Sequence, residues 1–296
     1  MLGLDILTIA RKICASYGLP EQNLVRVQSS DHAVFFVDEE LALKIYNGKR
    51  NCFERERRAL ELVVGRLAFS TPQIVHSGTF EGFEFLIQTR VSGETLTRTD
   101  FLALPFSYQM QIVESLAEEL RRLHSLNIDG WCSDWSKYID DQLSTFVSRQ
   151  IEHGVNSKII DQLPAYIRDS IALLPKKDMC FLHGDIHLGN LCFNQQGGVP
   201  KVSGLFDFAD SRVGCPEYDM LAVGLLIIQG ERELQRKFFS AYGYAESELD
   251  AEMRRRMMML TMTYETSDLR RYALRLRSDA VNLDLYQLEE AIWNFV

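Results

Sequence analysis

His183-Gly184-Asp185-Ile186-His187-Leu188-Gly189-Asn190 is the segment that decides the fold. It lies between two short apolar runs, Phe181-Leu182 and Leu191-Cys192-Phe193, so the pattern predicts a polar loop joining two strands. A carboxylate and a carboxamide five residues apart in one loop can divide two tasks. The Asp185 carboxylate can accept a proton from an attacking hydroxyl, and the Asn190 oxygen can hold a metal ion that neutralises phosphate charge.

A second segment, Leu205-Phe206-Asp207-Phe208-Ala209-Asp210, places a carboxylate directly after an apolar strand. Magnesium prefers oxygen ligands and keeps several of its waters, so a single carboxylate at a strand end is a suitable ligand. We expect Asp207 to bind magnesium and Asp210 to be a solvated loop residue.

The third signal is a lysine inside an apolar strand, Leu43-Lys44-Ile45. A buried ammonium needs a partner, and the following helix offers Glu54 and Glu56. Glu56 is the better candidate because it shares a helix face with the apolar residues of the next turns, whereas Glu54 can pair with a surface arginine. Such a pair can aim Lys44 at nucleotide phosphates.

Around these segments, hydrophobic periodicity predicts a small sheet followed by helices. The first part combines helices at residues 4–17 and 53–68 with five strands, at 24–27, 33–37, 41–46, 73–76 and 83–90. The second part follows a hinge at 89–93 and is mainly helical, with helices expected at 107–126, 158–174, 217–229, 231–242, 246–277 and 285–295.

The composition of the chain makes some classes of binding partner unfavourable. The 296-residue chain has a net charge of −9, so nucleic acid and anionic membranes are unfavourable partners. The charge fits a cationic acceptor weakly. No apolar run reaches the ~18–20 residues of a membrane span, the start lacks a signal-peptide pattern, and no CxxC pair indicates zinc. We expect a reducing, cytoplasmic location.

Together, Lys44, Asp185, Asn190 and Asp207 resemble the pattern of the aminoglycoside phosphotransferase and choline kinase-like family, relatives of the protein kinases. The resemblance covers nearly the whole chain in the right order. It implies an α+β, two-lobed, protein-kinase-like fold. Residues 1–90 would form a nucleotide-binding lobe with a five-stranded antiparallel sheet, and residues 91–296 a larger, mainly helical catalytic and acceptor-binding lobe.

The same resemblance implies roles for individual residues. Asp185 would be the catalytic base, and Asn190 and Asp207 would hold Mg²⁺. Lys44 would contact the phosphates of ATP or GTP, with Glu56 positioning it. The remaining implied positions are the phosphate-covering loop with Ser29 and Ser30, the adenine-binding hinge backbone from Gln88 to Val91, and Asp219 as a buttress of the catalytic loop.

Departures from the protein kinases favour a small-molecule kinase. The first hairpin has no GxGxxG, Gly184 replaces the arginine of His-Arg-Asp, and Ala209 replaces the glycine of Asp-Phe-Gly. Only eleven residues separate Asp207 from Asp219, too few for a phosphorylatable activation segment. We expect transfer of the γ-phosphoryl group to an aminoglycoside, amino alcohol or sugar hydroxyl. A protein-directed kinase and a catalytically silent nucleotide-binding pseudokinase are the alternatives.

Other polar residues have ordinary structural interpretations. His183 is expected to be structural, with its ring hydrogen-bonded near the catalytic loop, and His187 to pack, with contact to substrate as the alternative. His124 is expected to be a satisfied core histidine, and Met257-Met258-Met259 to face the core. The arginine clusters at 254–256 and 270–271 are typical of solvated helix faces, although an anionic substrate could use them. The acceptor-site candidates are Trp131, Asp134, Trp135, Asp140, Asp141, Tyr264, Glu265, Asp268, Glu289 and Glu290.

Overall fold

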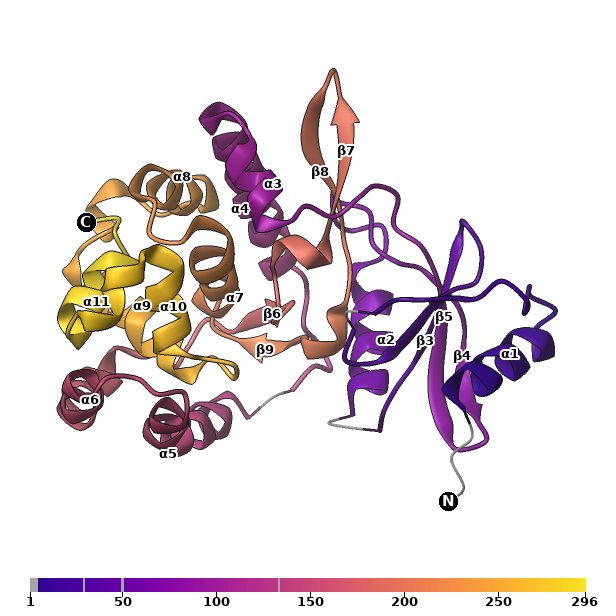
Figure 1. The fold of residues 1–296 in the computed structure, drawn as a ribbon, viewed down its shortest axis with the longest axis horizontal. Coiled ribbons are helices and arrows are strands. Elements are labelled where there is room, and N and C mark those ends of the chain that lie inside the picture. The colour runs from indigo at the N-terminus through magenta and orange to yellow at the C-terminus, as the bar shows by residue number, and fades with distance from the viewer. Residues whose placement is uncertain (1–4, 29, 49–50, 133) are drawn as a thin grey trace.

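The computed structural model describes residues 5–28, 30–48, 51–132 and 134–296. Figure 1 shows a sheet-containing part beside a larger, mostly helical part, with the hairpin β7–β8 rising between them. The α+β class and the order of the two parts agree with the sequence prediction.

The sheet is antiparallel throughout, in the order β1-β2-β3-β5-β4. The predicted hairpin between the second and third strands is present and is closed by a hydrogen bond from Val37 N–H to Leu41 O at 2.9 Å. The strands are β1 (Val25–Arg26), β2 (Ala33–Phe36), β3 (Leu41–Ile45), β4 (Ile74–Phe80) and β5 (Phe83–Thr89).

Alternation along β3 gives the sheet two different faces. Leu43 packs in one core cluster with Ile9 and Ile13 of α1 (Ile6–Ser16). Lys44 points to the opposite face, where its cross-strand partner Leu86 belongs to the core shared with α2 (Cys52–Val63). The register of the sheet therefore directs the lysine away from α1 and toward the second part.

The segment that follows β5, residues 90–94, is fixed by backbone hydrogen bonds at both of its ends. Arg90 N–H donates to Glu40 O at 2.7 Å, and Glu94 forms an antiparallel bridge with Phe193. Between them Gly93 has φ +117°, and a Cβ there would lie 2.7 Å from Phe193 O. Only glycine fits this close approach of two backbones without displacement.

The second part contains nine described helices and two small sheets. The helices are α3 (Arg98–Ala103), α4 (Phe106–His124), α5 (Trp135–Glu152), α6 (Ser157–Ser170), α7 (Glu217–Ala222), α8 (Arg232–Tyr242), α9 (Ala251–Thr263), α10 (Leu269–Leu276) and α11 (Leu285–Ile292). The small sheets pair β6 (Cys180–Leu182) with β9 (Arg212–Gly214) and β7 (Leu191–Gln196) with β8 (Val199–Leu205).

Several elements differ from the prediction. Helices α3 and α5 and strand β9 had not been predicted, and residues 217–229 continue from α7 into a π-helical turn, Val223–Ile228. The expected helix 246–277 is divided, because α9 ends at Thr263 and α10 begins only at Leu269. Asp268 accepts a hydrogen bond from Arg271 N–H at 2.9 Å, so a helix N-cap interrupts the apolar periodicity.

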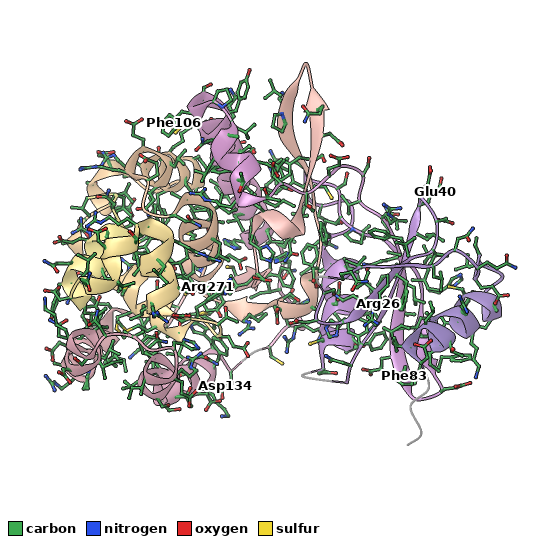
Figure 2. The ribbon with its side chains drawn as sticks, viewed as in Figure 1. Arg26, Glu40, Phe83, Phe106, Asp134 and Arg271 are labelled. Carbon is green, nitrogen blue, oxygen red and sulfur yellow. The ribbon has the colours of Figure 1, made fainter. Side chains whose placement is uncertain are left out.

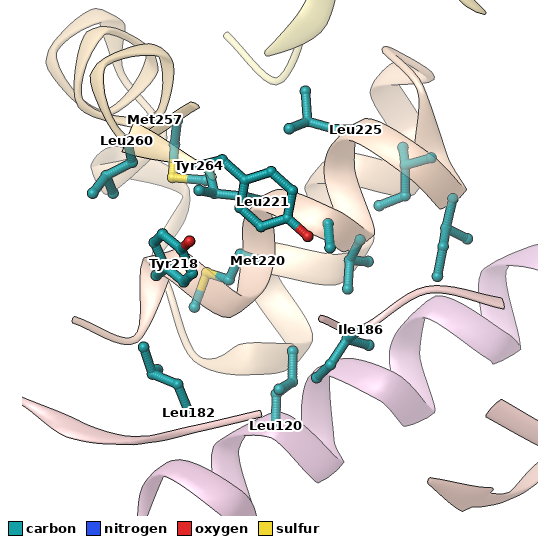
Figure 3. Close-up of a cluster of buried hydrophobic side chains, with 14 of the residues drawn as sticks. Leu120, Leu182, Ile186, Tyr218, Met220, Leu221, Leu225, Met257, Leu260 and Tyr264 are labelled. Atoms are coloured by element: carbon teal, nitrogen blue, oxygen red, sulfur yellow. The ribbon is translucent and has the colours of Figure 1, made fainter. Parts of the chain in front are cut away.

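Side chains follow the usual division between surface and core. Figure 2 labels Arg26 and Glu40 on the sheet part and Asp134 and Arg271 on the helical part. Figure 3 shows a buried cluster in which Met220 and Leu221 of α7 lie near Leu182 and Ile186, at either end of the 183–185 segment. Among the described residues, no helix has both the length and the apolar character to cross a membrane.

Candidate active site

Lys44, Glu56 and Asp207 meet at the sheet face opposite α1. The Lys44 ammonium lies 2.7 Å from Glu56 Oε2 and 2.6 Å from Asp207 Oδ1. Lys44 is 3% exposed and Glu56 is fully buried, whereas the Asp207 side chain is 37% exposed. The competing candidate Glu54 instead pairs with Arg57 at 2.7 Å. The buried lysine therefore has the partner that helix phase favoured, and also the predicted metal ligand.

Tyr46 is a member of this site that the sequence did not reveal. Its hydroxyl donates to Glu56 Oε2 at 2.6 Å, so the carboxylate is held from two directions. The ring of His32 lies 4.8 Å from the Tyr46 ring, between centroids. A tyrosine two residues after a strand lysine points to the same sheet face, and this spacing is the signal that could have found it.

Lys44 and Asp207 keep their charges in this buried group. Burial alone would lower the pKa of Lys44, but the charges of Glu56 and Asp207 outweigh it and raise the pKa above its ordinary value. Burial would likewise raise the pKa of Asp207, and Lys44 reverses this and lowers it. The ammonium and the Asp207 carboxylate are thus both ionised near neutral pH.

The Asp185 carboxylate is surrounded by three side chains. Tyr264 Oη donates to Asp185 Oδ1 at 3.1 Å, and His187 Nε2 lies 3.3 Å from Oδ2. Asn190 Nδ2 donates to the Asp185 main-chain oxygen at 2.9 Å and to Oδ2 at 3.3 Å. The Asp185 side chain remains 34% exposed, so an acceptor hydroxyl can reach it. His187 contacts the carboxylate, which corrects the expectation that it only packs.

A buried carboxylate holds the backbone of this loop. Asp219 on α7 accepts hydrogen bonds from the N–H groups of His183 at 2.8 Å and Gly184 at 2.7 Å. His124 Nε2 lies 3.1 Å from the same carboxylate, and its Nδ1 lies 2.9 Å from Tyr242 Oη. The structure thus places Asp219 where a buttress of the catalytic loop is required, and His124 is a core histidine with both ring nitrogens satisfied.

The protonation states of Asp185 and His187 are coupled. Burial alone would raise the pKa of Asp185, but the hydrogen bond and charge of His187 outweigh it and lower the pKa. Burial alone would lower the pKa of His187, and Asp185 reverses this and raises it. Asp185 is therefore ionised near neutral pH, the state that a hydrogen-bond acceptor for a hydroxyl requires.

The predicted magnesium ligands lie close together. Phe206, the residue before Asp207, donates its N–H to Asn190 O at 3.1 Å. The Asn190 side-chain nitrogen is engaged by Asp185, which leaves its side-chain oxygen available, and only one oxygen of Asp207 is used by Lys44. The described residues contain no group of three or more His, Cys, Asp or Glu suited to a metal. One carboxylate and one carboxamide fit magnesium, which binds with its waters and substrate phosphates.

The other predicted nucleotide residues are less directly placed. Gln88 pairs with Ala42 on one side and Ile74 on the other, so its main chain lies within the sheet, and its side chain is buried. Val91 follows the sheet, and its carbonyl accepts from Cys192 Sγ at 3.6 Å. Ser30 is half-buried, and Ser29 lies outside the described residues.

Five of the ten acceptor candidates have structural roles instead. Asp134 and Asp268 cap helices, and Asp141 pairs with Lys137. Glu289 is buried against Arg255 at 3.0 Å, and Glu290 lies 3.8 Å from Arg254. The arginines at 254–256 are thus largely paired, contrary to the expectation of a solvated face. Tyr264 is the candidate that contacts Asp185.

Comparisons with known proteins agree with this geometry. A family model described as "Phosphotransferase enzyme family" matches residues 23–260. Viomycin phosphotransferase of Streptomyces vinaceus is 23% identical over 194 residues, which cover 58% of this chain and 66% of that protein, just under two thirds of its length.

Solved structures show the same fold at low identity. The GDP complex of wild-type aminoglycoside 2'-phosphotransferase-IIIa superposes with a TM-score of 0.73 at 18% identity, covering 98% of this chain and 99% of that one. The streptomycin–ATP–APH(2")-IIa ternary complex superposes with a TM-score of 0.63 at 18% identity, covering 90% of this chain and 93% of that one. The predicted resemblance and two-lobed kinase-like fold are confirmed, and the chain belongs to the phosphotransferase enzyme family.

Proposed function

We propose that the protein is a small-molecule kinase that transfers the γ-phosphoryl group of ATP or GTP to a hydroxyl of a small acceptor. The main support is the convergence of four groups from distant parts of the chain. Asp207 pairs with Lys44 at 2.6 Å, Phe206 bonds to Asn190, and Asn190 bonds to Asp185. Phosphoryl transfer needs a lysine that contacts the phosphates, two oxygen ligands for a metal ion, and an ionised carboxylate beside them.

In the proposed reaction, Lys44 contacts nucleotide phosphates and Glu56 and Tyr46 fix its position. Asp185 accepts a hydrogen bond from the acceptor hydroxyl and takes its proton. The hydroxyl oxygen forms a bond to the γ-phosphorus as the bond to the bridging oxygen of the leaving nucleoside diphosphate breaks. Asn190 and Asp207 would hold Mg²⁺, which supplies neutralisation of phosphate charge when bound. Positioning and charge supply most of the rate acceleration in such reactions.

The relatives suggest both donors, because solved structures are named as complexes with GDP and with ATP. They also suggest hydroxylated small acceptors, since the named ligands of those proteins include kanamycin and streptomycin. The short interval between Asp207 and Asp219 supports a small acceptor over a protein, and the intact set Lys44, Asp185, Asn190 and Asp207 supports a catalyst over a pseudokinase. The described cysteines are all free thiols, which supports a reducing, cytoplasmic location.

The test is a screen of small hydroxyl compounds for Mg²⁺-dependent release of ADP from ATP and GDP from GTP. Asp185→Asn should abolish release while leaving Mg²⁺–nucleotide binding intact, because the carboxylate contacts the acceptor and not the donor. Asp161→Asn, at an exposed position of α6, is the matched control. Nucleotide binding without turnover of any compound would favour the pseudokinase, and phosphorylation of lysate proteins would favour the protein-directed kinase.

A further inference from the structure

The side-chain oxygen of Gln88 is buried without a hydrogen-bond partner. Gln88 lies in β5 and is 8% exposed, and its Oε1 has no donor among the described residues. Gln150, which is fully buried, instead uses both ends of its carboxamide. Its Nε2 donates to Ser267 O at 2.8 Å, and its Oε1 accepts from Leu269 N–H at 2.9 Å. Buried polar groups are nearly always hydrogen-bonded, so the Gln88 oxygen needs an explanation, and a ligand that supplies the donor is one.

Gln88 lies on the face of the sheet that carries Lys44. In the pairing of β3 with β5, Lys44 is opposite Leu86 and Ala42 is opposite Gln88. Side chains two residues apart on one strand share a face, and so do side chains directly opposite each other on paired strands. Ile87, between Leu86 and Gln88, packs on the other face in the core with α1 (Figure 1). The oxygen without a partner is therefore on the same side as the ammonium that we propose contacts nucleotide phosphates.

The neighbours of Lys44 on this face differ in the space they leave. Tyr46 is the next residue in one direction; it is 3% exposed, and its hydroxyl donates to the fully buried Glu56 at 2.6 Å. Ala42 is the next residue in the other direction, with only a methyl group as its side chain, and Gln88 lies across from it. Successive residues on one face of a strand are about 7 Å apart. A nucleotide with its phosphates at Lys44 would therefore extend its base over Ala42 and beside Gln88.

The two parts of the molecule meet shortly after Gln88 along the chain. The Cys192 thiol of β7 donates to Val91 O at 3.6 Å, and Glu94 forms an antiparallel bridge with Phe193. A base beside Gln88 would lie next to this junction, at a position where the flanking side chains are largely shielded from water. A hydrogen bond is electrostatically stronger in such a place than in water, and a missing one costs more. A single side chain can therefore discriminate between bases there.

We propose that the Gln88 carboxamide forms a hydrogen bond to the substituent at position 6 of the purine base of the phosphoryl donor. A carboxamide carries both an acceptor and a donor group. Its oxygen would accept from the 6-amino group of ATP. Its NH₂ group, turned about the last side-chain bond, would donate to the 6-oxo group of GTP. The inference rests on the proposed kinase function, and it adds a side chain that recognises the base to the backbone contacts that the family resemblance implies.

The experiment titrates the Mg²⁺ complexes of three triphosphates into the full chain and two variants by calorimetry. ATP and GTP carry a substituent at position 6 of the purine, whereas purine riboside 5′-triphosphate carries only hydrogen there. Gln88→Met removes the carboxamide and keeps a side chain of similar length. The matched control is Gln109→Met on α4, because Gln109 is also 8% exposed and its Nε2 donates to Leu104 O at 3.0 Å.

The unaltered chain should bind ATP, GTP or both about fivefold or more tightly than purine riboside 5′-triphosphate. Gln88→Met should remove that advantage and leave the affinity for purine riboside 5′-triphosphate unchanged, whereas Gln109→Met should change none of the three affinities. A loss confined to ATP assigns the 6-amino group as the partner, a loss confined to GTP assigns the 6-oxo group, and a loss of both shows that the carboxamide turns. An equal loss for all three triphosphates, or no loss for ATP and GTP, would overturn the inference.

Urea denaturation without nucleotide separates a role in binding from a role in folding. Gln88 Oε1 bonds to no donor among the described residues, so Gln88→Met should unfold at the same urea concentration as the unaltered chain or at a higher one. Gln109→Met deletes a formed hydrogen bond and should unfold at a lower concentration. A midpoint lowered as much in Gln88→Met as in Gln109→Met would assign Gln88 a structural role and contradict the proposal.

Turnover with the same triphosphates separates this inference from the kinase function. Equal affinities for all three, with release of the diphosphate in the presence of a hydroxyl compound, would overturn the inference and leave the kinase function standing. Absence of both binding and release with every triphosphate would overturn the function, and the inference with it.

Discussion

The carboxylate of Asp219 accepts a hydrogen bond from the backbone N–H of His183 at 2.8 Å, across 36 positions of sequence. Its second oxygen accepts from Gly184 N–H at 2.7 Å, and His124 contacts it from α4. A fully buried carboxylate with two backbone donors and a histidine nitrogen beside it is well compensated, and the groups that contact it in turn lose freedom. The backbone preceding Asp185 is therefore fixed by α7, not by its own loop.

Asp219→Asn should lower the free energy of unfolding by about 3 kcal/mol and reduce turnover more than nucleotide affinity. A carboxamide can accept from one N–H only, and its own NH₂ group would face the other donor. Hydrogen bonds to charged groups contribute about 1.5–3 kcal/mol each, which sets this magnitude. Urea denaturation and steady-state kinetics measure the two effects. Asp161→Asn, at an exposed position of α6, is the control. Equal stability of the two variants would show that Asp219 does not hold the backbone at residues 183–184.

Asp207→Ala should remove Mg²⁺-dependent nucleotide binding and leave the fold in place. The substitution deletes the carboxylate with a free oxygen and also one of the two partners of Lys44. Lys44 keeps Glu56 at 2.7 Å, so the buried ammonium is still paired. Calorimetry of ATP with and without Mg²⁺ measures the loss. An unchanged dependence on Mg²⁺ would show that the metal is held elsewhere.

Tyr46→Phe should raise the KM for the nucleotide and destabilise the protein by about 1–2 kcal/mol. The Tyr46 hydroxyl donates to Glu56 at 2.6 Å, and its removal leaves a buried carboxylate with one donor fewer. The freed Glu56 would hold Lys44 less firmly against the phosphates. Tyr17→Phe, at a 39% exposed tyrosine of the same part, is the control. A nucleotide KM equal to that of the unaltered chain would remove Tyr46 from the site.

The sequence predicted the parts of the site that local pattern and spacing determine. Lys44 was found because an ammonium inside an apolar strand needs a partner, and Glu56 because of helix phase. The contact between the two side chains is present at 2.7 Å. The two carboxylate segments were found because each follows a short apolar strand. Family membership and the two-lobed fold followed from their order along the chain.

The sequence did not predict contacts that depend on where separate elements meet. Tyr264 lies 79 positions from Asp185, in a break between α9 and α10 that helical periodicity concealed. His187 was expected to pack because no spacing rule indicates that its ring returns to Asp185.

Turnover should rise as pH increases through the raised pKa of His187. The folded-state pKa of this imidazole lies above its ordinary 6.5, because Asp185 outweighs the effect of burial. Below the folded pKa the imidazolium engages the carboxylate that we propose accepts the hydroxyl proton, and above it Asp185 is a stronger acceptor. The contribution of His187 to stability has the opposite trend: it is complete below the unfolded pKa of the imidazole and is lost as pH rises through the folded one.

His187→Asn should therefore move the acid limb of the pH–kcat profile to lower pH and flatten the pH dependence of unfolding over the same range. His153→Asn is the control, because His153 lies 3.8 Å from Asp268 at the start of α10. If the acid limb of the His187→Asn profile lay at the same pH as that of the unaltered chain, the limb would belong to the titration of another group.

Gly184→Ala should destabilise the protein strongly and abolish turnover, because two costs coincide at this position. Gly184 has φ +91°, and a Cβ there would lie 2.4 Å from the main-chain oxygen of Asp210. Gly82 is the matched control, with φ +85° and no atom within 4 Å of the same Cβ. Gly82→Ala carries only the backbone strain, about 1–2 kcal/mol. Gly184→Ala must also separate the 183–185 segment from the 208–210 turn, whose backbones touch at this point. Thermal and urea denaturation of both variants, with steady-state kinetics, measure the difference. Equal stability would show that the contact with Asp210 relaxes without cost and that the catalytic segment tolerates displacement.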